Sequence, residues 1–83
     1  MTSPIDRPFA AEHLELANRH VAEGRSRVEA QLALIAKLAR QGHDTSQART
    51  ILRQFVETLA LQVETRERIA EELRLSGEHE LRR

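Results

Sequence analysis

Residues 41–48 read QGHDTSQA, the one place in this 83-residue chain where a glycine, a histidine–aspartate pair and two hydroxyl groups lie together. Gly42 can adopt the left-handed backbone conformation that ends a helix, and Asp44 can cap the start of another. A link this short makes the two flanking helices antiparallel neighbours. The alternative, a general base formed by His43 and Asp44, lacks a pocket, a nucleophile and oxyanion donors. The stretch therefore predicts a bend between helices.

Both flanks of the bend carry apolar residues at helical spacing, and neither shows the period-two alternation of a strand. In the first flank the repeat, every seven residues, comprises Leu14, Val21, Val28 and Ile35. In the second flank the apolar residues are Leu52, Phe55, Val56, Leu59, Val63, Ile69, Ala70 and Leu73, interrupted by Gln62 and Arg66. Narrow stripes of this kind are typical of helices that pack along one seam. The sequence predicts an all-α, two-helix antiparallel hairpin with helices at about 8–41 and 45–76.

Helix-start and helix-stop signals divide the chain into three parts. Pro8 suits the first turn of a helix, so residues 1–7 are expected to form a flexible N-terminal tail. Gly77 is expected to stop the second helix and to leave residues 77–83 as a fraying, charged C-terminal tail. Residues 8–76 would form the single hairpin domain. Folding at residue 43 is expected to place Gln31 near Phe55.

The apolar surface exceeds what two helices can cover. Residues 28–39 read VEAQLALIAKLA, and Leu32 and Leu34 lie on opposite shoulders of the stripe through Ile35. A helix that is apolar on several sides is buried on several sides, so we expect two hairpins to form a homodimeric four-helix bundle, parallel or antiparallel. The expected oligomer interface comprises Leu32, Leu34, Ile35, Leu38, Leu52, Phe55, Val56, Leu59 and Leu61.

The amino-acid composition and the lack of known motifs make several classes of function unlikely. The chain has no cysteine, and its 13 basic and 13 acidic residues balance. A balanced charge and only two aromatic residues make a nucleic-acid partner unlikely. No apolar run approaches a membrane span and no signal peptide is evident, so we expect a cytoplasmic protein, and the preference for arginine over lysine suggests a bacterial source. No catalytic constellation or cofactor motif is present, and we expect a non-enzymatic protein without cofactors.

Three residues are candidates for a metal site. His13 and His20 are seven residues apart and lie on one helical face, and Glu23 follows His20 by three positions. A histidine and a carboxylate at this spacing can bind a divalent ion. However, two helical turns separate the histidines by about 10.5 Å, which is too far for one ion within one chain. Boundary histidines beside the seam are the simpler interpretation, and a site shared between two chains is the alternative.

Part of the chain, residues 13–70, resembles a group of short, uncharacterised proteobacterial helical-hairpin proteins. The shared pattern is H-x6-H-[VI]-x2-G followed by G-H-D-T, here His13, His20, Val21, Gly24 and residues 42–45. The resemblance implies a helical hairpin and no assigned activity. From the two complementary stripes, the surplus apolar surface and the lack of a catalytic constellation, we expect a homo-oligomeric helical interaction or regulatory module with an unidentified protein partner. A small metal-binding or metal-sensing protein is the alternative.

Overall fold

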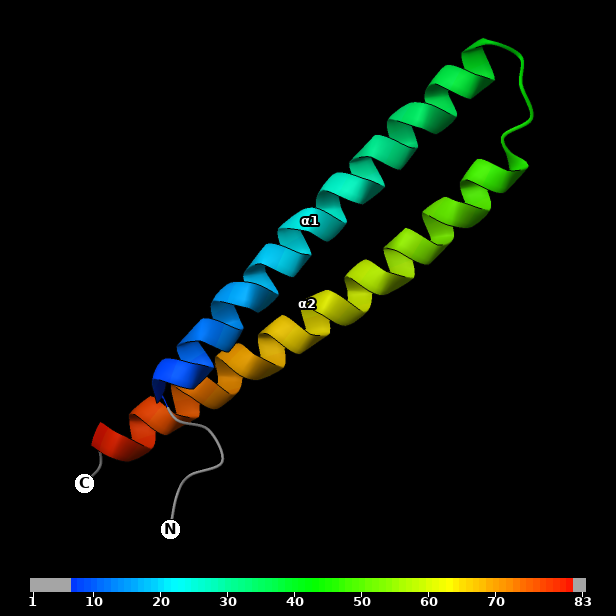
Figure 1. Ribbon diagram of the computed structural model, residues 1–83. Coiled ribbons are helices and arrows are strands. Elements are labelled where there is room, and N and C mark those ends of the chain that lie inside the picture. Colours follow the sequence, from blue (N-terminus) through cyan, green and yellow to red (C-terminus); the bar gives the residue numbers. More distant parts are fainter. Residues whose placement is uncertain (1–6, 82–83) are drawn as a thin grey trace.

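A computed structural model describes the backbone of residues 7–81 and the side chains of residues 10–77. This part of the chain contains two helices, α1 (Arg7–Arg40) and α2 (Ser46–Leu81), and no strand. The helices run antiparallel, side by side, as a long hairpin (Figure 1). The predicted all-α hairpin is confirmed. Neither helix is long and apolar enough, over the described residues, to cross a membrane.

Gly42 ends α1 in the way that its sequence context predicts. Its φ angle of 75° lies in the left-handed region, which glycine adopts without the steric cost of a side chain. The His43 N–H donates to the Leu38 carbonyl at 2.9 Å, and the Gly42 N–H donates to the Ala39 carbonyl at 3.1 Å. This pair of bonds is the Schellman motif, which satisfies carbonyls left without a partner at the end of a helix.

Asp44 caps the start of α2. Its Oδ1 accepts hydrogen bonds from the backbone N–H of Ser46 at 2.9 Å and from the Ser46 hydroxyl at 2.7 Å. These two donors hold the pKa of the Asp44 carboxyl below its usual value, because they favour the charged form. The bend prediction for residues 41–48 is therefore confirmed at both helix ends.

The far end of α2 differs from the prediction. Gly77 does not stop the helix, which continues to Leu81. The reason is that Gly77 keeps a negative φ angle, unlike Gly42. A glycine inside a helix costs only about 1 kcal/mol relative to alanine, and the following Glu, Glu and Leu residues favour helix. Of the predicted N-terminal tail, residues 1–6 lie outside the described residues, and Arg7 is the first residue of α1.

The seam between the helices is built mainly from small residues. On α1 the buried positions recur every seven residues, at Ala10, Ala17, Gly24 and Gln31. Among the side chains of residues 10–77, Val21 is the largest that is fully buried, at 1% exposed, and Ala48 is the buried apolar residue of α2. The larger side chains of the predicted stripes, such as Phe55, are only half-buried. One hairpin therefore has a thin core.

Two contacts show how α2 lies along α1. The Gln31 Nε2 donates to the Ala48 carbonyl at 2.9 Å, near the bend. Further along, Gly24 lies against the side chains of Gln62 and Leu59. Gly24 and Gln62 are equally far from residue 43, so this contact agrees with a fold at that residue. The expected proximity of Gln31 to Phe55 stays a prediction. At the bend, α1 extends past the start of α2 (Figure 1).

Candidate functional site

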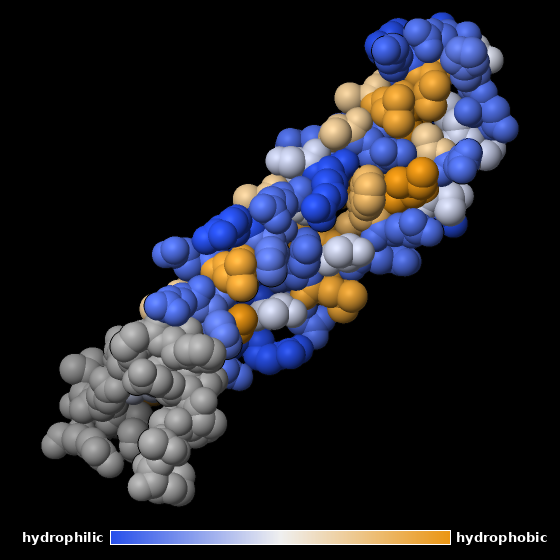
Figure 2. Space-filling view, in the orientation of Figure 1, coloured by the Kyte–Doolittle hydropathy of each residue, from blue (hydrophilic) through white to orange (hydrophobic). Residues whose placement is uncertain are grey.

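Large apolar side chains reach the surface on both helices. Among the nine residues of the predicted oligomer interface, four are exposed: Leu61 by 65%, Leu32 by 51%, Val56 by 47% and Leu34 by 43%. The other five are half-buried: Ile35, Leu38, Leu52, Phe55 and Leu59. Figure 2 shows apolar surface of this kind on the face in view, broken by polar residues. Aliphatic side chains this exposed, clustered along a hairpin, mark a candidate contact surface.

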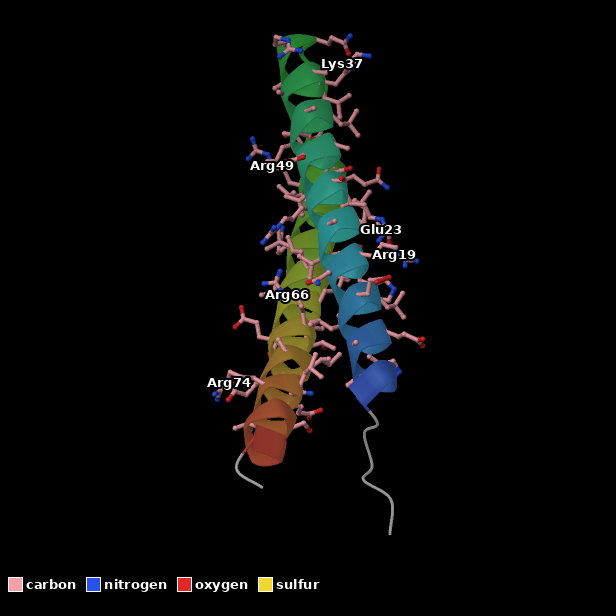
Figure 3. All side chains as sticks on the ribbon, turned by 90° about the vertical axis from the view of Figure 1, so that its left-hand side faces the viewer. Arg19, Glu23, Lys37, Arg49, Arg66 and Arg74 are labelled. Atoms are coloured by element: carbon pink, nitrogen blue, oxygen red, sulfur yellow. The ribbon has the colours of Figure 1, made fainter. Side chains whose placement is uncertain are left out.

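These exposed residues fall on two sides of the hairpin. Leu32 and Leu34 are two positions apart, so about 200° of rotation around α1 separates them. The same division is visible in Figure 3, where Arg49 and Arg66 project to one side and Glu23 and Lys37 to the other. One flat partner cannot cover both sides, so each side is a separate candidate surface.

The first surface, here called the arginine groove, lies near the bend between α1 and α2. It is an open groove of about 510 Å³ lined by Leu32, Ile35, Arg49, Leu52, Arg53 and Val56. Four aliphatic side chains form its floor and walls, and two exposed arginines from successive turns of α2 flank it. The groove thus combines an apolar surface with positive charge along one rim.

The second surface, here called the histidine face, lies on the opposite side of the hairpin. Its groove measures about 190 Å³ and is lined by Ala17, His20, Thr58, Leu61, Gln62 and Thr65. Leu34 belongs to the same side, because it follows His20 by two repeats of seven residues. Apart from His20, none of the residues lining this groove has an ionisable side chain. The two surfaces therefore differ in electrostatic character.

The arginines along α2 have different surroundings. Arg66, which interrupts the apolar stripe of α2, is half-buried and lies 3.6 Å from the Glu67 carboxylate of its own helix. Further along α2, Arg68 pairs with Glu64 at 3.2 Å. By contrast, neither Arg49 nor Arg53 has an ion pair or a side-chain hydrogen bond within the described part of the chain. The two arginines of the groove are available to an external carboxylate.

The histidine candidates do not converge into a metal site within one chain. His13, His20 and Glu23 are all exposed on α1. Among the residues with described side chains, no three histidine, cysteine, aspartate or glutamate residues lie close enough together to hold a metal ion. His20 nevertheless opens into the groove of the histidine face. A metal site built on these residues would need ligands beyond the described side chains of one chain.

Gly24 and Gln62 form a contact between α1 and α2. The side chains of Gln62 and Leu59 occupy the space that a Cβ on Gly24 would fill. The Gln62 side-chain oxygen is buried against Gly24 and has no hydrogen-bond donor. In the sequence, Gln62 was noted only as an interruption of the stripe. Gly24 and Gln62 are equally far from residue 43, so their pairing agrees with the predicted fold point.

The turn residues that were weighed as a general base have a structural role in this conformation. Asp44 is engaged with Ser46 as a helix cap, and His43 donates its backbone N–H to α1. Both side chains are exposed at the bend. The conformation of this stretch is therefore accounted for by helix capping.

No known protein family, curated protein or solved structure matches this chain. The suggested likeness to short proteobacterial helical-hairpin proteins thus stays a prediction.

Proposed function

We propose that this chain is a non-enzymatic, cytoplasmic interaction module that works as a homodimer, two hairpins packing their histidine faces into a four-helix bundle. The observation that carries the proposal is the thin core. Val21 is the single large side chain, among those described, that one hairpin buries fully, whereas Leu34 and Leu61 remain exposed on the histidine face. Burying apolar area of this kind is the main favourable contribution to folding and association.

The size of the face is sufficient for a stable dimer. Helices of 34 and 36 residues are about 50 Å long. A face of that length and two helices wide offers on the order of 900 Å² per copy, and a stable interface needs about 800 Å² per partner. The hairpin therefore has enough surface to bind a second copy along its length.

The charge distribution favours the histidine face over the arginine groove for self-association. The centres of stable interfaces are depleted of charged residues. His20 is the one ionisable residue that lines the groove of the histidine face, whereas Arg49 and Arg53 flank the other groove. A symmetric dimer brings the same patch of each copy together, so like charges would meet at the arginine groove.

Matched substitutions on the two sides of α1 test this arrangement. Leu34→Glu, on the histidine face, is expected to convert the dimer to a monomer in size-exclusion chromatography, because it buries a charge in the interface. Leu32→Glu, the same change on the opposite side, and Glu15→Ala, on an exposed position, are expected to leave the dimer intact. Equal effects of Leu34→Glu and Leu32→Glu would reject the assignment of faces.

A shared metal site is the second candidate function, supported by the position of His20 in the groove of the histidine face. Dimerisation through this face would bring histidines of two copies to one interface, where Glu23 and His13 are the further candidate ligands. Titration with zinc, nickel or iron during thermal melting tests it. If the site exists, the metal should raise the melting temperature of the wild-type chain but not of a variant with both His13→Ala and His20→Ala. An unchanged melting temperature of the wild-type chain would reject the metal site.

A further inference from the structure

The arginine groove is left open by the proposed dimer, which uses the opposite side of the hairpin. Its apolar lining residues Leu32 and Val56 are about half exposed, although each lies beside a half-buried neighbour on its own helix. An open apolar groove of about 510 Å³ is a typical docking site for the apolar face of an amphipathic helix. The question is which chemistry its occupant carries.

The length of the groove matches two turns of a helix. On α2 its lining runs from Arg49 to Val56, which is seven residues or about 10.5 Å of helix. A helix that lies along this groove presents aliphatic side chains at i, i+3 or i+4, and i+7 over the same distance. Such a helix would lie against α1 and α2 together and complete a three-helix arrangement.

The charges select an acidic occupant. Arg49 and Arg53 are four residues apart, so their side chains leave the same side of α2 on successive turns. Both are exposed, and within the described part of the chain neither has an ion pair. Carboxylates on the flank of an incoming helix would pair with them, and guanidinium–carboxylate pairs can be bidentate. A second copy of the groove itself would instead bring four guanidinium groups together.

We propose that the arginine groove binds one amphipathic helix of a partner protein. The partner helix places aliphatic residues at i, i+3 or i+4, and i+7 against Leu32, Ile35, Leu52 and Val56, and aspartate or glutamate residues toward Arg49 and Arg53. This surface goes beyond the proposed homodimer and does not depend on it, because the two use opposite sides of the hairpin.

Fluorescence anisotropy of the full chain with two synthetic peptides tests the proposal. The probe is an 18-residue, alanine-based helix with leucines at the stated spacing and glutamates along one flank, and the control has lysines in place of the glutamates. We expect the acidic peptide to bind at least about tenfold more tightly than the basic one, with the difference shrinking as salt is added. The double variant Arg49→Glu, Arg53→Glu is expected to bind the basic peptide more tightly than the acidic one. Val56→Asp is expected to weaken the binding of both peptides.

Three results would overturn the proposal. The first is equal binding of both peptides, or no binding of either. The second is binding of the acidic peptide that survives both Val56→Asp and the double arginine substitution. The third is a change of oligomeric state in the double arginine variant, which would assign the groove to a second copy of the chain. Helical circular dichroism of each variant confirms that it is folded before binding is measured.

Anionic vesicles distinguish a membrane surface from a helix. The proposal would also be overturned if the chain bound phosphatidylglycerol vesicles through Arg49 and Arg53 but did not bind the acidic peptide. Sedimentation of the same samples measures the oligomeric state, so a failure of the groove proposal can be told apart from a failure of the proposed homodimer. A wild-type dimer that fails to bind the peptide rejects the groove alone, whereas a monomer that binds it rejects the homodimer alone.

Discussion

A Cβ atom on Gly24 would lie 2.4 Å from the side-chain oxygen of Gln62 and 3.1 Å from Cδ1 of Leu59. Gly24 has no positive φ angle, so a substitution here acts through these two side chains, which would have to move, and not through backbone strain. The same contact buries the oxygen of Gln62 without a donor. A buried acceptor of this kind opposes folding by about 1–3 kcal/mol. Gly24 and Gln62 thus form a coupled pair at the middle of the seam.

This coupling predicts non-additive substitutions. Gly24→Ala should raise the free energy of unfolding by about 1 kcal/mol through helix propensity if nothing obstructs the new methyl group. We expect that gain in a Gln62→Ala background and a smaller gain, or a loss, in the wild-type chain, because Gln62 and Leu59 must shift there. Urea denaturation of the two single variants and the double variant measures the coupling, which we expect to exceed about 0.5 kcal/mol. Additive effects would contradict the contact.

A substitution of Gly42 should destabilise the chain through backbone strain and not through a packing clash. A Cβ on this residue would meet nothing within 4 Å, but its φ of 75° is strained for a residue with a side chain. We expect Gly42→Ala to lower the free energy of unfolding by about 1–2 kcal/mol. Gly42→Asn should cost less, because asparagine tolerates the left-handed region. Thermal melts of both variants measure the difference. Equal stability of Gly42→Ala and the wild type would contradict the left-handed conformation of Gly42 at the end of α1.

The cap of α2 predicts a loss of stability in acid. Ser46 lowers the pKa of Asp44 in the folded chain, so the unfolded chain binds the proton first as the pH falls. The stabilisation from this group is complete above about pH 4 and is lost as the pH falls through the folded pKa. Asp44→Asn keeps a capping side chain without a titrating group, so its melting temperature should fall less between pH 5 and 3. Identical pH profiles would argue against the Asp44–Ser46 bonds.

Local signals in the sequence were sufficient to predict the hairpin. Gly42 and Asp44 act through backbone conformation and bonds to near neighbours, so their roles could be inferred from residue type and order. The repeat of Leu14, Val21, Val28 and Ile35 likewise identified the seam of α1. Both helix ends at the bend were predicted within one or two residues for this reason.

Features that depend on how the two helices are offset could not be predicted. The hydrogen bond from Gln31 to the Ala48 carbonyl is one example, because it depends on the exact height of α2 against α1. Gly77 also misled the prediction, since a glycine stops a helix only where its φ becomes positive. The predicted oligomer interface stays a prediction, although four of its residues, Leu32, Leu34, Val56 and Leu61, are exposed on a single hairpin.

The central claim is that one hairpin is only half of the functional unit. Sedimentation equilibrium of the wild-type chain at micromolar concentration tests this most directly, because it measures mass independently of the elongated shape. The account predicts a species of about twice the chain mass of 9.5 kDa. A fully helical, cooperatively melting species of 9.5 kDa under the same conditions would contradict it.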